Sequence, residues 1–353
     1  MVVSYYDALL PVREPRAGLQ GVTAGLWLPY RVLASIRVPG GEIVIAFVSD
    51  SPELSGMFGA NWAPAAPHQE PDAALYALGK PASRYGLDGG WDGARWWSPD
   101  EKTMLVCGFD SYRLVKVCVR GICSAVSGDD IVFLHGCALS VGAESDRRGV
   151  VITGSSGAGK TTLVAGLLRH PELSVAVLND DWGAISLSSG DLVSTGERML
   201  HMKSGSVLAL QPGFFTSARP GSHSRDLSDR DQAARMLVMP ESVYGKAWTT
   251  ARTAVQQVAV VVREPADWLP PGERGAAVRA IEGEGGERDE GDTVSIHHHE
   301  AFFNGSLILT SEEDKLREEG HYRRLLDRTT VSWINNCGTS GDLVENFISA
   351  VIK

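Results

Sequence analysis

The chain of 353 residues exceeds the roughly 150 residues of a typical domain, so two domains are expected. Hydrophobic residues make up 43% and charged residues 22% of the sequence, an ordinary globular composition that supports a sizeable core. The net charge of −10 at pH 7 repels a phosphate backbone, which argues against general nucleic-acid binding, although backbone N–H groups can still bind a phosphate locally.

The N-terminal part, residues 1–125, is predicted to be a β-rich accessory domain. Alternating or β-branched apolar residues indicate strands at 31–38, 42–48, 103–108 and 113–119. Between 62 and 97 the sequence is rich in Pro, Gly, Ala and Trp, which predicts a packed irregular segment. No catalytic constellation is evident here, and the tryptophans are expected to pack in the interior rather than line a cleft.

The remaining chain, residues 126–353, is predicted to be an α/β domain. Apolar runs indicate strands at 131–134, 138–141, 149–153, 174–178 and 257–262. Helical spacing indicates helices at 163–169, 227–238, 311–326 and 343–352. A strand, a glycine-rich turn, a helix and a strand follow one another at 149–178. This βαβ unit implies parallel pairing of its two strands.

A phosphate-binding loop (P-loop, or Walker A motif) follows the strand at 149–153. The sequence GSSGAGKT at 154–161 matches the pattern G-x-x-x-x-G-K-[ST] in full. Glycines let backbone N–H groups turn inward around an anion, the lysine adds a mobile positive charge, and the threonine hydroxyl suits Mg²⁺. A nucleotide is therefore expected to be bound by Gly154, Ser155, Ser156, Gly157, Ala158, Gly159, Lys160, Thr161 and Thr162. Because the chain has no Asn/Thr-Lys-x-Asp motif for guanine, ATP with Mg²⁺ is the default expectation.

Paired aspartates, Asp180 and Asp181, end the next predicted strand. Ligands gather at the carboxyl ends of strands in an open parallel sheet, so one carboxylate can bind the metal while the other accepts a proton. The alternative is an Asn-Asp turn that caps a following segment, and the nearby P-loop favours the metal role. His135 follows the strand at 131–134, and by itself such a histidine is more often a buried hydrogen-bonding residue than a catalytic one.

Three motifs in this order resemble the catalytic core of HPr kinase/phosphorylase and its relatives, whose P-loop architecture is similar to that of phosphoenolpyruvate carboxykinase. The motifs are the His-Gly in Leu134-His135-Gly136, the P-loop, and the Asp-Asp in Leu178-Asn179-Asp180-Asp181. The resemblance covers roughly residues 130–185 and rests on motif order and spacing. It implies an HPr kinase-like catalytic domain at 126–353.

The resemblance also implies residue roles. Asp180 would be the base near an acceptor hydroxyl, and His135 would interact with it. Lys160 would hold phosphates, with Thr161 and Asp181 on the Mg²⁺ side. The Pro-, Arg-, Gly- and Asn-rich substrate signature of the family cannot be aligned after the Asp-Asp motif, so HPr itself is not the expected substrate.

Candidate substrate contacts follow the aspartates at Glu197, Arg198 and Lys203. A basic side chain opposite a phosphoryl group stabilises its transition-state charge, and a solvated loop is an equal alternative. The histidines at 297–299 lie beside the acidic, glycine-rich segment 282–292, which favours an exposed loop over a metal site.

The leading hypothesis is an ATP- and Mg²⁺-dependent kinase that transfers the γ-phosphoryl group to a hydroxyl of a small metabolite or a Ser-containing peptide. The alternative is a nucleotide-dependent switch or ATPase that acts on a protein partner without a phosphorylated product. Carboxykinase-like chemistry is weaker, because its further basic and metal-binding residues cannot be placed. The resembled kinases form multimers, so a homo-oligomer stays open.

Cysteine usage and the N-terminus predict a cytoplasmic protein. Five cysteines without a Cys-x-x-Cys pair favour a reducing compartment over a disulfide framework or a zinc finger. The start, MVVSYYDALLPVREP, lacks the basic and long apolar regions of a signal peptide. No apolar stretch approaches the roughly 20 residues of a membrane span, so no membrane partner is expected.

Overall fold

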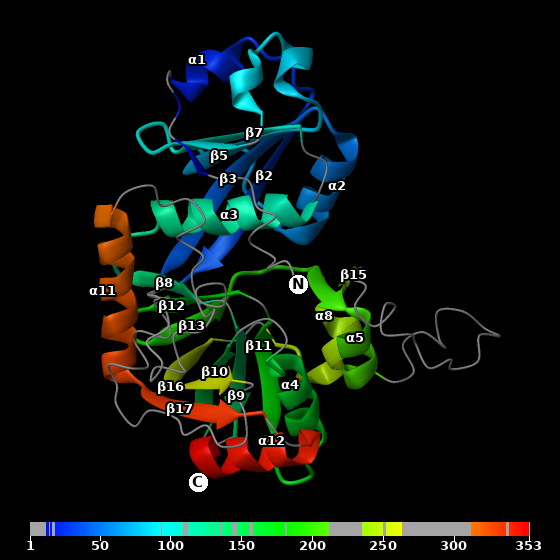
Figure 1. Cartoon of the computed structure of the whole chain (residues 1–353), viewed down its shortest axis with the longest axis vertical. Helices are drawn as coiled ribbons and strands as arrows, with labels where there is room; N and C mark the ends of the chain where they lie inside the picture. The colour runs from blue at the N-terminus through cyan, green and yellow to red at the C-terminus, as the bar shows by residue number, and fades with distance from the viewer. Residues whose placement is uncertain are drawn as a thin grey trace, which may run out of the picture. The chain divides into compact units, whose positions relative to one another are not determined.

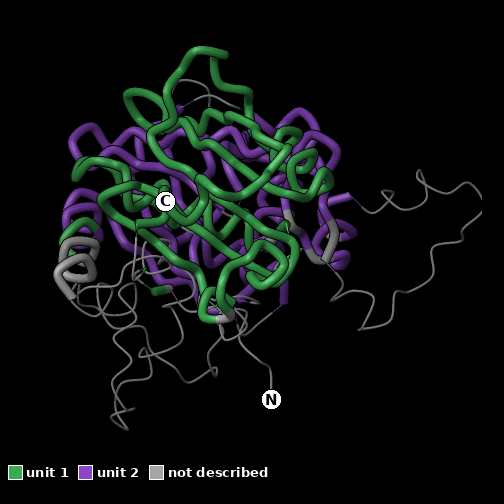
Figure 2. Tube along the Cα trace, turned by 90° about the horizontal axis from the view of Figure 1, so that it is seen from above, with its two compact units in different colours: residues 1–133, 303–321 green, residues 134–302, 322–353 purple. Residues whose placement is uncertain are grey.

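The computed structural model folds into two compact units (Figures 1 and 2). The first comprises residues 1–133 and 303–321, and the second comprises residues 134–302 and 322–353. The structure describes residues 12–13, 15, 18–92, 94–108, 112–134, 136–142, 147–154, 158–180, 182–211, 235–249, 252–262, 312–336 and 339–352. The division falls within β8 (Ile131–Leu134), a little after the predicted boundary at 125/126.

A mixed sheet forms the centre of the first unit, with the strand order β1-β6-β7-β5-β3-β2-β4. The strands are Val12–Arg13 (β1), Tyr30–Val38 (β2), Gly41–Ser49 (β3), Ala63–Pro64 (β4), Ala73–Leu78 (β5), Arg95–Ser98 (β6) and Thr103–Cys107 (β7). The strands predicted at 31–38, 42–48 and 103–108 are confirmed as β2, β3 and β7. β2 and β3 form an antiparallel hairpin that turns at Gly40, whose φ of 82° lies in the left-handed region that suits glycine.

Helical segments accompany this sheet. They are Leu19–Ala24 (α1), Pro52–Asn61 (α2), Ala82–Tyr85 (η1), Gly89–Trp91 (η2) and Tyr112–Val126 (α3). α2 begins after Ser51, whose hydroxyl accepts a hydrogen bond from the Leu54 N–H at 3.2 Å, and Pro52 occupies its first turn. Phe58 of α2 stacks on Phe47 of β3 with ring centroids 4.6 Å apart, which fixes the helix on the sheet.

Two predictions for the first unit are wrong. The segment 113–119, predicted as a strand, belongs to the helix α3. Its Val115, Val117 and Val119 alternate with other residue types and so imitate a strand, although Lys116 and Arg120 recur at helical spacing and are both buried in the structure. The segment 62–97 is not irregular throughout, since it contains β5 and β6.

A second mixed sheet forms the centre of the second unit. Its strands include Cys137–Val141 (β9), Arg148–Thr153 (β10), Val175–Asn179 (β11), Gly183–Ser186 (β12), Asp191–Ser194 (β13), Thr253–Val262 (β16) and Thr330–Asn335 (β17). The order is β11-β9-β10-β16-β13-β12, and β17 also pairs with β16. The predicted strands at 131–134, 138–141, 149–153, 174–178 and 257–262 are confirmed within a residue or a few at their ends.

The strand pairing around β10 differs from the simple βαβ prediction. β9 lies between β10 and β11 and is antiparallel to both, so β10 and β11 run in the same direction without pairing. The predicted direct pairing is wrong because β9 immediately precedes β10 and returns to it through the short connection 142–147. The parallel partner of β10 is β16, and β17 continues the parallel set.

The helices of the second unit include Lys160–Arg169 (α4), Ser204–Leu210 (α5), Pro240–Tyr244 (α8), Gly245–Ala247 (η3), Ser340–Phe347 (α12) and Ile348–Ile352 (η5). α11 (Glu312–Arg328) crosses the second division of the chain. Leu200–Lys203 (β14) and Arg235–Val238 (β15) form a small antiparallel sheet. The helices predicted at 163–169, 311–326 and 343–352 are confirmed. The helix predicted at 227–238 is wrong at 235–238, which form β15; residues 227–234, 282–292 and 297–299 lie outside the described residues.

The core of this unit joins the sheet to α4 and α12. Buried side chains of α4, among them Leu163 and Leu167, share one apolar cluster with Phe347 of α12. Gly166 of α4 allows close helix contact, because a side chain there would collide with Val344. This packing holds the start of α4 in a fixed position after β10.

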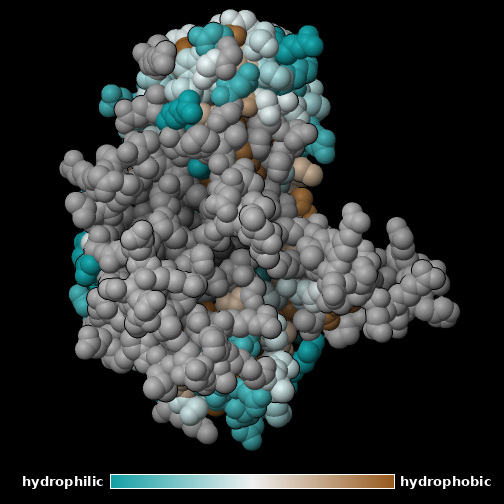
Figure 3. Space-filling view, viewed as in Figure 1, coloured by the Kyte–Doolittle hydropathy of each residue, from teal (hydrophilic) through white to brown (hydrophobic). Residues whose placement is uncertain are grey.

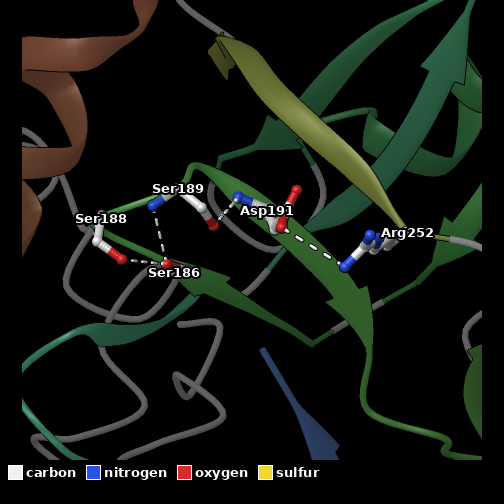
Figure 4. A network of polar contacts seen from close by, with 5 residues as sticks. All are labelled: Ser186, Ser188, Ser189, Asp191 and Arg252. Carbon is white, nitrogen blue, oxygen red and sulfur yellow. Dashed lines mark hydrogen bonds and ion pairs between the residues drawn. The ribbon is translucent and has the colours of Figure 1, made fainter. Parts of the chain in front are cut away.

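The turn between β12 and β13 is held by a small polar network (Figure 4). The hydroxyls of Ser186 and Ser188 are 3.0 Å apart, and the Ser189 N–H donates to the Ser186 hydroxyl at 3.0 Å. Asp191 forms an ion pair with Arg252 at 3.9 Å, beside the start of β16. The hairpin is thereby anchored at its turn, and its open end pairs Gly183 with Ser194.

The described surface carries few large apolar side chains. The exposed ones are those of Trp27, Tyr30 and Met239. In Figure 3 the described residues at the top of the view, which belong to the first unit, are mainly hydrophilic or intermediate. Among the residues that the structure describes, no helix has the length and apolar character needed to cross a membrane.

Candidate functional site

Several strands of the second unit end at one edge of its sheet (Figure 1). In the parallel set, Thr153 of β10 lies opposite Val260 of β16, and Val262 lies opposite Asn335 of β17. On the other side, β9 pairs Cys137 with Ile152 of β10 and Ala138 with Asn179 of β11. The segments after β10, β11 and β17 therefore leave the sheet at the same edge.

The glycines of the P-loop are required by its backbone. Gly154 has a φ of 142° and Gly159 a φ of 109°, both in the region that favours glycine. A side chain at Gly154 would collide with the carbonyl oxygen of Val261 in β16. A side chain at Gly159 would collide with the amide of Asn336, which follows β17. The two described ends of the loop thus lie tightly against β16 and the segment after β17, where a side chain would not fit.

Lys160 begins α4, and its side chain reaches back to Gly154 at the start of the loop. Its ammonium group donates a hydrogen bond to the carbonyl oxygen of Gly154 at 2.5 Å. Thr161 is half-buried and Thr162 is exposed in the first turn of the same helix. Ser155, Ser156 and Gly157 lie outside the described residues. The described part of the loop therefore places a positive side chain and the amino end of a ten-residue helix at one point.

Asn336 is a site residue that the sequence analysis missed. Its amide Nδ2 donates a hydrogen bond to the carbonyl oxygen of Ala158 at 2.7 Å, although the two residues are 178 positions apart. Ala158 is 1% exposed and the bond is partly buried, so water has little access to the carbonyl oxygen that this donor satisfies. The only available signal was the position of Asn336 after a buried strand, and its contact required knowledge of the strand order.

Asp180 is held by a tyrosine that was also missed. Tyr244 at the end of α8 donates a hydrogen bond from its hydroxyl to Oδ2 of Asp180 at 2.5 Å. The Tyr244 ring is 5% exposed and stacks on Trp248 with centroids 5.8 Å apart. The Thr249 N–H donates to the carbonyl oxygen of Val177 at 2.9 Å, which fixes this segment beside β11. Asp180 therefore has a defined orientation at the strand end.

Cys137 shows that Asp180 and Lys160 share one electrostatic environment. Its thiol is completely buried at the start of β9, and this burial is the main cause of a pKa raised well above the ordinary value. The negative charge of Asp180 raises that pKa further, while the positive charge of Lys160 lowers it. Since β9 is the one strand between β10 and β11, the two strand ends are about 10 Å apart. A protonated, inaccessible thiol is expected to act as part of the core and not as a nucleophile.

His135 and Asp181 lie outside the described residues, so their predicted roles stay predictions. Gly136 is described, and a side chain there would meet the carbonyl oxygen of Ile152 at 2.5 Å. The backbone just before β9 therefore passes directly beside the end of β10.

The predicted substrate residues have different environments. Glu197 is buried with 4% exposure, whereas Arg198 is exposed. Lys203 lies in β14, opposite Arg235, and its side chain is not among those described. The pairing of Gly183 with Ser194 brings the start of this segment near β11, because the Asn179 amide lies next to Gly183. Their contact with a substrate stays a prediction.

The family model described as CobW/HypB/UreG, nucleotide-binding domain, matches residues 149–209. This range begins in β10, contains the P-loop, α4 and Asp180, and ends in α5. The chain is a P-loop nucleotide-binding protein. No curated protein matches the chain.

This match corrects the proposed resemblance to HPr kinase/phosphorylase, which is wrong. The matched family consists of P-loop GTPases, so assignment as a kinase that phosphorylates a hydroxyl is also wrong. The physical reason is that a phosphate cradle followed by a carboxylate binds a triphosphate whichever group attacks it. His-Gly and Asp-Asp are dipeptides that many sequences contain, so their order around a P-loop could not identify the acceptor. The mixed α/β fold with a P-loop is retained.

Proposed function

We propose that the protein is a Mg²⁺-dependent nucleoside triphosphatase whose nucleotide state controls its action on a protein partner. The observation that carries this proposal is the convergence of the P-loop, Lys160 and Asp180 at one sheet edge. The match of residues 149–209 to a nucleotide-binding domain supports it independently.

The residues of the edge fit a triphosphate with its cation. Gly154 and Gly159 place no side chain at either end of the loop, so backbone N–H groups there can approach phosphate oxygens. The Thr161 hydroxyl is a hard oxygen donor of the kind that Mg²⁺ prefers, and Asp180 adds a negative charge at the same sheet edge that attracts the cation. When bound, Mg²⁺ supplies charge neutralisation on the phosphate oxygens.

The protein side chains then have distinct tasks. Lys160 exchanges the carbonyl oxygen of Gly154, its partner at 2.5 Å, for phosphate oxygens. Its charge stabilises the negative charge that the transferring phosphoryl group carries. Asp180, oriented by Tyr244, holds the attacking water toward the phosphate by accepting its hydrogen bond. The assay below, with ATP and with GTP, decides whether the bound nucleotide carries adenine or guanine.

The test is phosphate release from ATP and from GTP, with Mg²⁺, by the full chain and by Lys160→Ala. We expect free phosphate from at least one nucleotide, and a fall of about 100-fold or more in Lys160→Ala because a transition-state charge contact is lost. Arg252→Ala is the matched control: it removes a 76% exposed positive side chain from the same unit, at the β12–β13 turn, and should leave the rate unchanged. An intact chain that binds nucleotide but releases no phosphate would contradict the proposal.

The switch itself is tested by hydrogen exchange of the full chain with a nucleoside diphosphate and with a non-hydrolysable triphosphate. A difference in backbone protection outside the P-loop is expected, since a switch requires two conformations with different ligand affinities. Identical backbone protection with the two nucleotides would contradict the proposed switch, and the proposed hydrolysis would still stand.

A further inference from the structure

The hydrogen bond between Tyr244 and Asp180 joins the proposed hydrolytic site to a separate segment of the second unit. This segment, called here the Tyr244 segment, comprises residues 235–248: β15, α8, η3 and Trp248. We infer that Tyr244 is a positioning residue for Asp180 and that their hydrogen bond carries the nucleotide state to the Tyr244 segment. This inference rests on the proposed function and names the element that responds to it.

The first step is geometric. Asp180 lies at the end of β11, at the same edge as the P-loop, and Tyr244 comes from a helical turn 64 residues later. The 2.5 Å bond is a charge-assisted hydrogen bond of a hydroxyl to a carboxylate, which is shorter and stronger than a neutral one. The bond is partly buried and Tyr244 is 5% exposed, so water competes for it less than at an open surface.

The second step concerns what holds the Tyr244 segment. One end pairs with β14, where Leu200 lies opposite Val238. The other end is fixed at Trp248, which forms a bridge with Val177 of β11. The Tyr244 ring stacks on Trp248 at an interplanar angle of 16°. A change at the Tyr244 hydroxyl is therefore passed to Trp248 and to the point where the segment meets the sheet.

The third step is energetic. A bound Mg²⁺–nucleotide attracts the charge of Asp180, and this competes with donation from Tyr244. The hydrogen bond therefore differs in strength between the empty and occupied sites, and a ligand shifts conformations only through such a difference. Met239, at 49% exposure beside α8, places an apolar side chain at the surface of the same segment.

The test compares Tyr244→Phe with Tyr85→Phe in the full chain. Tyr244→Phe keeps the ring and its stacking but removes the hydroxyl. Tyr85→Phe is the matched control, because Tyr85 donates the same kind of bond to Asp50 at 2.6 Å in the first unit. For Tyr244→Phe we expect the hydrolysis kcat to fall about 10-fold to 100-fold, with KM and nucleotide Kd within about twofold, as loss of a charge-assisted bond predicts. Tyr85→Phe should leave all three unchanged.

A second readout follows Trp248 by fluorescence when Mg²⁺ and a non-hydrolysable triphosphate are added. The wild type should show a change that Trp248→Phe removes, and Tyr244→Phe should lose the change while still binding nucleotide. If Tyr244→Phe fails to fold, Asp180→Ala removes the acceptor instead and should also lose the change while still binding nucleotide.

The inference is overturned if Tyr244→Phe, or Asp180→Ala in its place, keeps the Trp248 signal, or if Tyr244→Phe keeps normal turnover. Failure of the proposed function is distinct. A wild type that binds nucleotide but releases no phosphate ends the hydrolytic proposal, while the fluorescence comparison still decides the role of Tyr244.

Discussion

Replacing Asn336 by alanine should weaken nucleotide binding at a loop that Asn336 does not belong to. The substitution removes the hydrogen bond from Nδ2 to the carbonyl oxygen of Ala158, which is 2.7 Å long. Since Ala158 is 1% exposed, its carbonyl group is left buried without this donor, at a cost of about 1–3 kcal/mol. If that cost falls on the conformation that holds phosphate, the nucleotide Kd rises roughly 5-fold to 150-fold.

The assay is nucleotide titration by calorimetry, paired with thermal unfolding of each variant. Gln257→Ala is the matched control, because the Gln257 amide donates to the Ser332 hydroxyl at 2.8 Å and to the Ala350 carbonyl oxygen at 3.2 Å, away from the loop. It should lower the unfolding temperature without changing Kd. Asn336→Asp should bind worse than Asn336→Ala, since a carboxylate would face the carbonyl oxygen. Unchanged Kd and stability in Asn336→Ala would refute the reasoning.

Two further predictions concern the backbone of the loop and the buried thiols. Gly159→Ala should reduce nucleotide affinity more than Gly190→Ala. Both glycines have a positive φ, 109° and 77°, but only the carbon added at Gly159 collides with a neighbour, the Asn336 amide. Equal nucleotide affinities of the two variants by titration would contradict this. Burial raises the pKa of Cys118 to about 11, although the nearby Arg95 opposes the shift, so the folded thiol stays protonated while the unfolded one ionises near its ordinary value of 9.0. The protonated Cys118 thiol makes its full contribution to the free energy of unfolding below pH 9. This contribution is lost as pH rises toward 11, at up to about 1.4 kcal/mol per pH unit. Denaturant unfolding from pH 8 to 11 should show this decline, and Cys118→Ala should make it shallower.

The P-loop was predictable because its determinants are local. Glycines at fixed offsets, a lysine and a following helix lie within one short stretch, and the structure places Gly154 and Gly159 in the conformations that exclude other residues. Asn336 and Tyr244 have no such signal. Each reaches the site through the order of strands or the path of a later segment, which local sequence patterns do not encode.

The errors have equally specific causes. In α3 a period of two in the valines at 115, 117 and 119 was given more weight than the helical spacing of the basic residues Arg113, Lys116 and Arg120. In the second unit the strands before and after α4 were expected to pair with each other. β9 pairs with β10 instead, because it immediately precedes β10 in the chain and a short connection joins the two. The kinase assignment was wrong for a different reason. The motifs identify the residues that bind the phosphates, and they do not identify the group that attacks the γ-phosphate.

The insertion of β9 sets the spacing of the site. The end of β10 and the acidic end of β11 are separated by the width of one paired strand. Backbone hydrogen bonds on both sides of β9 fix this distance, and the side chain of Cys137 projects from a face of the sheet without spacing the two strands. The distance across the proposed site is therefore set by a strand that lies between its two halves and contributes no proposed ligand of the nucleotide.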